Sequence, residues 1–183
     1  MNPVFSLFKH LLLLFCLLAA GVAEARAADA VETSGTVLSV ALPVLGGAMT
    51  LRNDDAQGRV QLAEALALTA GVSYGLKYSI DATRPNGGSQ SFPSAHTSVS
   101  FAAADFIGRR YGWEYGIPAY AAAGFVGYSR VEAKAHHRYD VAAGAALGIL
   151  SDALFTSRFK EKGVKISALP ADDGATLRLS YAW

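Results

Sequence analysis

Apolar residues gather in five segments of this chain, and their spacing in each is helical. The amphipathic stretch QLAEALALTA opens the second segment and gives the plainest case. Gly, Pro, Asn and Asp are densest in the intervals between segments, where they predict turns, at residues 52–55, 84–88, 112 and 116–118. The predicted helices are residues 37–50, 60–77, 97–111, 117–130 and 139–159. We therefore expect an all-α protein, a compact bundle of about five to six helices.

The end of the chain follows a different period. Apolar side chains alternate there with small or polar ones, at Leu177, Leu179, Tyr181 and Trp183. Residues 164–169 offer a partner strand across the turn 170–174, so residues 164–183 are predicted to form a short C-terminal β-hairpin. An aromatic last residue is also typical of the final strand of an outer-membrane barrel. One hairpin cannot close a barrel, which favours a hairpin packed on the bundle.

The first 27 residues have the pattern of a signal peptide. Lys9 and His10 precede an apolar run over residues 11–20, and two A-x-A cleavage sequences follow, Ala23-Glu-Ala25 and Ala25-Arg-Ala27. This pattern predicts export to the periplasm. The alternative is an uncleaved anchor helix, for which the run is shorter than the roughly 20 residues that a membrane span prefers.

Composition limits what the rest of the chain can be. The 183 residues are 52% hydrophobic and 17% charged, with a net charge of +1, so nucleic-acid binding is disfavoured. There is no internal repeat and no long linker, and residues 28–183 are predicted to form a single domain. The apolar segments are interrupted by Glu64, Asp105 and Asp152, which favours a bundle that is soluble or attached to a membrane peripherally.

Three spaced clusters carry the candidate chemistry. They read K-x6-RP, PS-x-H and SR-x5-H-x3-D, and they consist of Lys77, Arg84 and Pro85; Pro93, Ser94, Ala95 and His96; and Ser129, Arg130, His136 and Asp140. Together they supply three cations, two imidazoles, a hydroxyl and a carboxylate. Phosphoryl transfer needs such a set, because it depends on positive charge around the phosphoryl oxygens, a nucleophile and a proton donor.

The order and spacing of these clusters resemble the signature of the type 2 phosphatidic acid phosphatase family, which shares its site with the vanadium haloperoxidases. The resemblance covers residues 77–150. It implies a phosphate-binding set composed of Lys77, Arg84, Ser94, the backbone N–H of Ala95, and Arg130. Taken singly, the three cations are equally typical of solvated or helix C-terminal residues, and Ser94 of a helix N-cap.

The resemblance also assigns catalytic roles. It makes His136 the nucleophile that forms a phosphohistidine, Asp140 the acceptor of the other ring N–H of His136, and His96 the general acid. His137 is the rival nucleophile, but only His136 satisfies the spacing. A metal site built from His96, His136 and Asp140 is the alternative use of these side chains, and its ligand pattern is weak. We therefore expect no metal and no cofactor.

Ala95 departs from the family, which has glycine between the serine and the histidine. If the loop there required a positive φ, the alanine Cβ would strain it by about 1–2 kcal/mol. We therefore expect an altered rate or substrate preference. Four aromatic residues near the clusters either guide an acyl chain or belong to the core: Phe92, Phe101, Tyr128 and Tyr139.

These observations predict an exported, metal-independent phosphatase that hydrolyses phosphate monoesters, lipid-linked ones above all, through a phosphohistidine. Two alternatives remain. One is a vanadium-dependent haloperoxidase, and the other is a noncatalytic protein that binds phosphate or lipid.

Overall fold

The computed structural model describes residues 27–159, 163–171 and 174–182. Its helical part confirms the all-α prediction. The helices are α2 (Ala27–Arg52), α3 (Ala56–Ile80), α4 (Ala95–Tyr111), α5 (Trp113–Glu132) and α6 (Arg138–Phe155). The predicted signal peptide lies outside the described residues, apart from Ala27, where α2 begins.

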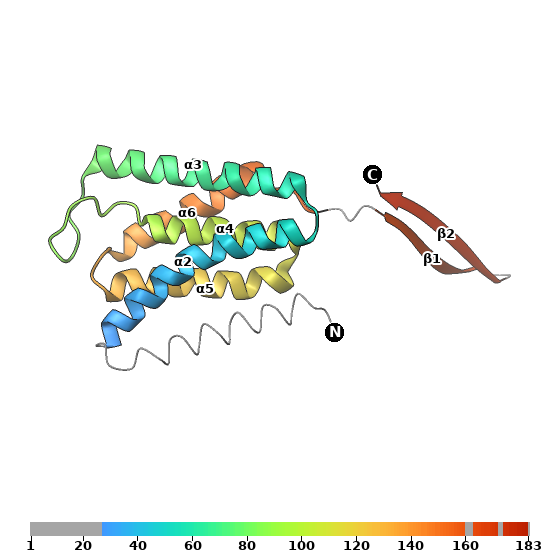
Figure 1. The fold of residues 1–183 in the computed structure, drawn as a ribbon, viewed down its shortest axis with the longest axis horizontal. Coiled ribbons are helices and arrows are strands. Elements are labelled where there is room, and N and C mark those ends of the chain that lie inside the picture. The colour runs from blue at the N-terminus through green and yellow to red at the C-terminus, as the bar shows by residue number, and fades with distance from the viewer. Residues whose placement is uncertain (1–26, 160–162, 172–173, 183) are drawn as a thin grey trace.

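The central helix of the bundle is α4. It packs against each of the other four helices, which surround it in Figure 1. Such a position requires small or apolar side chains on every face, and Ala102, Ala103, Ala104, Phe106 and Ile107 are all buried. The residues at the two ends of α4 are therefore fixed by the whole bundle.

Two glycines of α6 allow it to lie against the backbone of α4. A Cβ added to Gly148 would stand 2.2 Å from the carbonyl oxygen of Ser98, and one added to Gly144 would stand 2.7 Å from that of Ser94. Both distances are shorter than real Cβ contacts, so only glycine permits this approach. The contact places the start of α6 beside the start of α4.

The helix ends differ from their predicted positions. The first two helices begin earlier than expected, at Ala27 and Ala56, and α6 ends at Phe155. The break predicted around Pro118 is wrong, because Pro118 lies inside α5. The break predicted at Gly112 is confirmed, since the chain turns there between α4 and α5, and its φ of 115° favours glycine.

Two strands follow the helices. Strand β1 (Gly163–Ala171) pairs antiparallel with β2 (Gly174–Ala182), with Gly163 opposite Ala182 and Ala171 opposite Gly174. In Figure 1 the pair stands apart from the helices, so the predicted packing of a hairpin on the bundle finds no support.

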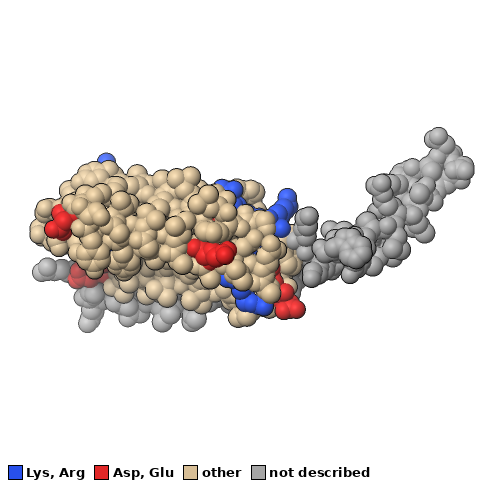
Figure 2. Space-filling view, turned by 90° about the horizontal axis from the view of Figure 1, so that it is seen from above, with Lys and Arg blue, Asp and Glu red and all other residues tan. Residues whose placement is uncertain are grey.

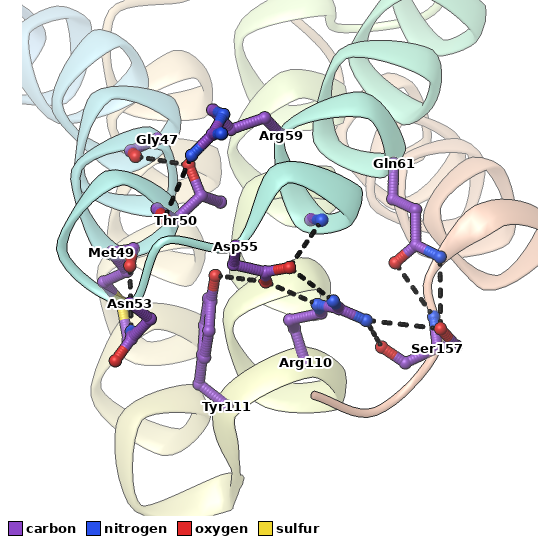
Figure 3. A network of polar contacts seen from close by, with 11 residues as sticks. Gly47, Met49, Thr50, Asn53, Asp55, Arg59, Gln61, Arg110, Tyr111 and Ser157 are labelled. Carbon is purple, nitrogen blue, oxygen red and sulfur yellow. Dashed lines mark hydrogen bonds and ion pairs between the residues drawn. The ribbon is translucent and has the colours of Figure 1, made fainter. Parts of the chain in front are cut away.

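A polar network joins the helix ends opposite the α3–α4 loop. Arg110 donates two hydrogen bonds to Asp55, at 2.7 and 2.6 Å, and Tyr111 donates a third at 2.8 Å. Arg110 also donates to the carbonyl of Ser157 beyond α6, and Gln61 contacts the same serine (Figure 3). The network therefore ties the α2–α3 turn, the end of α4 and the segment after α6 together.

The outside of the bundle is unusually apolar. Exposed large hydrophobic side chains occur on α2, α3, α5 and α6 and include Val40, Val44, Ile117, Leu150 and Leu154. Figure 2 shows a face that is uncharged over most of its area, with charged side chains mainly toward the end from which the strands leave. Among the described residues, one helical segment, Asp29–Arg52, is long and apolar enough to cross a membrane.

Candidate active site

The three sequence clusters meet at one end of the bundle, the end of the α3–α4 loop (Figure 1). Lys77 lies in the last turn of α3 and Arg84 in the loop that follows. The second cluster opens α4. The third spans the end of α5, the turn after it and the first turn of α6, where Asp140 lies. Residues as far apart as 77 and 140 thus lie at the same end of the bundle.

Lys77 is a buried cation. Its ammonium donates to the carbonyl of Gln90 at 2.6 Å. Burial lowers the pKa of Lys77, the positive charge of Arg84 lowers it further, and the charge of Asp140 acts in the opposite direction. Asp81 caps the C-terminus of α3 and forms no ion pair with either cation in the described part of the chain.

Arg84 is held by the loop that contains it. Its Nε donates to the carbonyl of Ser89 at 2.9 Å, and its backbone N–H donates to the carbonyl of Gly88 at 2.6 Å. These bonds close a tight turn and engage only one of the guanidinium nitrogens. The terminal nitrogens of Arg84 form no hydrogen bond among the described residues, so they can bind an oxyanion.

The second cluster forms the N-terminus of α4. Ser94 is fully buried and is the N-cap, and its Oγ lies 2.9 Å from Oγ1 of Thr97. Ala95 is the first residue of the helix and is not among the residues with positive φ. The strain considered for Ala95 is therefore absent. First-turn N–H groups have no acceptor within a helix, so those of Ala95 and His96 can serve an anion.

Arg130 lies in the last turn of α5 and is buried. Its guanidinium donates to Oγ of Ser129 and to the carbonyl of Glu32 on α2. Burial lowers the pKa of Arg130, and the charge of Glu32 partly opposes this. Neither hydrogen-bond acceptor is charged, and within residues 27–159 Arg130 forms no ion pair.

His136 and Asp140 are neighbours, but the expected hydrogen bond between them is not formed. Nδ1 of His136 lies 3.7 Å from Oδ2 of Asp140, which is beyond hydrogen-bond length. That carboxylate oxygen instead accepts from Oγ of Ser91 at 2.5 Å and from the backbone N–H of His137 at 2.8 Å. The carboxylate is already engaged by other donors, so it faces the ring as a nearby charge.

Both histidines of the site are poorer bases than a free histidine. Burial lowers the pKa of His136 to about 4, and the charges of Lys77 and Arg84 contribute; a backbone hydrogen bond with Ser91 and the charge of Asp140 oppose this. Partial desolvation also lowers the pKa of His96, aided by Arg130, Lys77 and Arg84. Near neutral pH, therefore, the His136 ring is neutral and can act as a nucleophile.

His137 lies outside this group. Its Nε2 is 3.1 Å from the carbonyl of Thr83, and its ring stacks on Tyr139 with 4.9 Å between centroids. This agrees with its interpretation as a residue at the rim.

Sequence reasoning missed three contributors to the site. Ser91 holds Asp140, the carbonyl of Gln90 holds Lys77, and α2 provides the carbonyl of Glu32 to Arg130. Two of these groups are backbone carbonyls, which any residue would offer. Only Ser91 contributes through its side chain, so only this residue, a serine two positions before Pro93, could have been noticed in the sequence.

The aromatic residues near the clusters divide between the two uses considered. Phe101 packs against the core, whereas Tyr128 and Tyr139 are exposed by 55% and 58%. Tyr74 and Tyr78 are also exposed, in the half of α3 that ends at the site. No cluster of three or more His, Cys, Asp or Glu side chains suited to a metal occurs in the part of the chain that was described.

Comparison with known proteins gives a consistent result. The PAP2 superfamily model matches residues 86–163. A lipid A 4'-phosphatase from Helicobacter pylori is 34% identical over 143 residues, which cover 72% of this chain and 72% of that protein. A lipid A 1-phosphatase from Porphyromonas gingivalis is 39% identical over 100 residues, 51% of this chain but only 22% of the relative.

The fold has a counterpart among solved structures. The crystal structure of LpxE from Aquifex aeolicus superposes with a TM-score of 0.55 at 22% sequence identity, and the match covers 78% of this chain and 92% of that one. The likeness shows a shared fold, and the identity to the Helicobacter protein extends over most of both chains. The chain therefore belongs to the PAP2 superfamily.

Proposed function

We propose that this chain, a phosphoric monoester hydrolase, removes phosphate from a lipid-linked monoester through a phosphohistidine at His136. The observation that carries the proposal is the group of cations at the site. Lys77, Arg84 and Arg130 form no ion pair among the described residues; all three charges act on His96, and those of Lys77 and Arg84 also act on His136. Lys77 and Arg130 are buried. Buried positive charge is costly unless it is compensated, so a bound phosphate dianion is the natural counterion.

The first chemical step forms the covalent intermediate. A ring nitrogen of neutral His136 attacks phosphorus, the N–P bond forms, and the P–O bond to the leaving group breaks. Lys77, Arg84 and Arg130, with the N–H groups of the first turn of α4, offset the charge that develops on the phosphoryl oxygens. The positive charge that develops on the ring is stabilised by Asp140, 3.7 Å from Nδ1.

His96 is the proposed proton donor. Desolvation and the neighbouring cations lower its pKa, so few molecules carry the proton at neutral pH. A bound phosphate dianion offsets most of the positive charge around the ring and therefore favours the protonated form. Protonated His96 then gives its proton to the leaving oxygen. In the second step it takes a proton from water, whose oxygen forms a P–O bond as the N–P bond breaks.

The substrate we propose is lipid A or a phospholipid of related chemistry. Both curated relatives are named as lipid A phosphatases, one for the 4' and the other for the 1 position. The exposed Tyr74, Tyr78, Tyr128 and Tyr139 lie on helix ends near the site and are suited to the boundary between water and acyl chains. Because the relatives differ in position, an assay has to decide between the two phosphates.

We further propose that the protein is exported and held at a membrane facing the periplasm. The exposed hydrophobic side chains, the largely uncharged face in Figure 2 and the apolar segment Asp29–Arg52 support membrane attachment, and the pattern of residues 1–27 supports export. This attachment would keep the active-site end close to lipid head groups. We also propose that residues 28–183 form one domain, with a C-terminal hairpin at residues 164–183.

The test is phosphate release by purified protein in excess chelator, with lipid A, phosphatidic acid, phosphatidylglycerophosphate and a soluble aryl phosphate as substrates. The proposal expects turnover on lipid substrates that persists in chelator and is lost in His136→Ala. Trapped enzyme should carry phosphate that is labile to acid and stable to alkali, as a phosphoramidate is.

His137→Ala is the matched control, since it removes the adjacent imidazole. Loss of activity in this variant but not in His136→Ala would move the nucleophile to His137. Activity abolished by chelator would overturn the metal-free reaction. Halide oxidation with peroxide and vanadate, without phosphate release, would favour the haloperoxidase.

A further inference from the structure

One buried serine in the α3–α4 loop has no place in the motif. Ser91 is fully buried, and its Oγ donates to Oδ2 of Asp140 at 2.5 Å across 49 positions of sequence. Its backbone N–H donates to the carbonyl of Ala82 at 2.8 Å, which fixes the serine within the loop. A hydroxyl with a rigid backbone and a short bond to an ionised group is well suited to orient that group.

The contacts of Asp140 show what this orientation achieves. Oδ2 accepts from Ser91 and from the backbone N–H of His137, whereas Oδ1 of Asp140 and Nδ1 of His136 lack hydrogen-bond partners in the described structure. A buried polar atom without a partner is costly. Oδ1 of Asp140 is a possible acceptor and Nδ1 of His136 a possible donor, and both lack partners. Nδ1 lies 3.7 Å from Oδ2 of the same carboxylate.

We propose that Ser91 is a positioning residue for phosphoryl transfer, holding the Asp140 carboxylate so that it faces Nδ1 of His136. This inference rests on the proposed function. Ser91 keeps its proton throughout and touches neither phosphate nor leaving group. As the ring attacks phosphorus and becomes positively charged, a small movement brings Nδ1–H to the fixed carboxylate. The bond is thus made in the transition state and not in the resting enzyme.

Loss of the Ser91 hydroxyl should lower kcat and leave KM nearly unchanged. Ser91→Ala leaves Lys77, Arg84 and Arg130 in place, so KM should change by less than about two-fold. With only one donor left, Oδ2 of Asp140 is free to rotate from the ring, and kcat should fall by roughly 10- to 100-fold, the usual effect of losing a supporting hydrogen bond in a site. A purely structural role for the serine would lower the melting temperature and leave kcat unchanged for the folded fraction.

The experiment measures kcat, KM and the melting temperature of Ser91→Ala, with Ser39→Ala as control. Ser39 is also buried, but its hydroxyl bonds only within α2, to the carbonyl of Thr36. We expect wild-type kcat in the control. Ser91→Cys keeps a weak donor and should fall between wild type and alanine. If the alanine variant does not fold, kcat of Ser91→Cys is compared with that of the wild type instead.

A double-mutant cycle with Asp140→Asn completes the test. If Ser91 acts through Asp140, Ser91→Ala should cost less than about two-fold once Asp140 is replaced. Full additivity, wild-type kcat in Ser91→Ala, or an effect on KM alone would overturn the role of Ser91. An inactive wild type, or activity that survives His136→Ala, would instead overturn the proposed function.

Discussion

The two ends of the bundle differ in whether their buried charges have partners of opposite charge. At the end shown in Figure 3, Asp55 and Arg110 are both nearly inaccessible and form an ion pair of 2.6 Å, completed by Tyr111 and the carbonyl of Ser157. Burial alone would raise the pKa of Asp55, but hydrogen bonds from Arg110, Gly58 and Tyr111 lower it instead. The buried charges of Asp55 and Arg110 are thus matched from within the chain.

At the active-site end the charges are not matched. The buried cations Lys77 and Arg130 donate only to carbonyl or hydroxyl oxygens. Burial lowers the pKa of each, which means that the fold disfavours their charged forms. One end therefore contributes stability, and the other gives up stability to keep its charges available for a ligand. Six predictions follow from this arrangement of charges.

The largest effect belongs to the nucleophile. His136→Ala should lower kcat by roughly 10⁴-fold or more, as removal of a nucleophile does in other covalent enzymes. The melting temperature should stay the same or rise, because a buried ring with an unpaired Nδ1 is lost. Steady-state phosphate release and a thermal scan on the same preparation measure both. Comparable losses in His136→Ala and His137→Ala would contradict the assignment.

The opposite end should respond in stability alone. Asp55→Ala leaves Arg110 buried without a counter-charge and should lower the free energy of unfolding by about 3–5 kcal/mol. Activity of the folded protein should be unchanged, since the network does not reach the site. Denaturant unfolding gives the first quantity and initial rates the second. Glu64→Ala, an exposed carboxylate on α3, is the control; an equal loss there would show that the network contributes nothing special.

Lys77→Met should separate function from stability. Removing an unmatched buried cation should raise the free energy of unfolding by roughly 0.5–2 kcal/mol. It should also lower kcat/KM by about 100-fold, because one charge facing the phosphoryl oxygens is gone. The exposed Lys134→Met should change neither. A Lys77 variant that is both inactive and less stable would place this lysine with the structural charges.

The pH dependence follows from the two histidines. His136 must be neutral to attack, so kcat/KM should fall about ten-fold per unit below its pKa of about 4. His96 must be protonated, and its pKa is lowered from 6.5, so the alkaline limb of the profile should lie below that value. A bell-shaped profile with an acidic optimum is the expected result. An optimum above pH 8 would exclude this pair as base and acid.

Stability should also respond to His136. Because the folded pKa is about 4 and the ordinary value 6.5, the unfolded chain binds more protons between these values. Stability from this group is therefore full above pH 6.5 and declines as the pH falls toward 4. The slope should be smaller in His136→Ala, which a series of melting temperatures across this range would reveal.

The smallest effect is expected at Ala95. Ala95→Gly should change kcat and KM by less than about two-fold, because the residue lies in the first turn of α4 and its φ is not positive. The family's glycine would thus not be required by backbone conformation here. A large gain in activity, measured on lipid and soluble substrates, would show that the alanine Cβ restricts substrate entry.

The sequence could predict which residues converge, but not how they are held. The residue types and their spacing were sufficient to predict one shared site for a set of residues at one end of the bundle: Lys77, Arg84, Ser94, Arg130 and His136. The resemblance pairs Asp140 with His136, whose Nδ1 lies 3.7 Å from the carboxylate, but gave no sign of Ser91, the donor to Oδ2 from a distant loop. Pairings between loops depend on tertiary packing, which periodicity does not encode.

The boundaries of the helices show the same limit. Local composition suggested breaks at Gly112 and around Pro118; the chain does turn at Gly112, yet α5 passes through Pro118. Packing on both sides of α5 outweighs one lost backbone hydrogen bond. Exposure was also hard to predict. Asp105 and Asp152 interrupt the apolar segments and so favoured a soluble or peripherally attached bundle, but both are buried within it. Asp105 accepts hydrogen bonds there from Arg109 and Tyr120.

The glycine contact between α4 and α6 has a final consequence. It lets two parallel helices begin side by side, so the positive ends of two macrodipoles point at the same place. Asp140 offsets this field in the first turn of α6, whereas α4 has no acidic residue in its first turn. A phosphate bound there would supply the missing negative charge. Because backbone dipoles do not titrate, this attraction would persist at any pH at which the bundle is folded, and the ligand itself would act as a brace between the two helices.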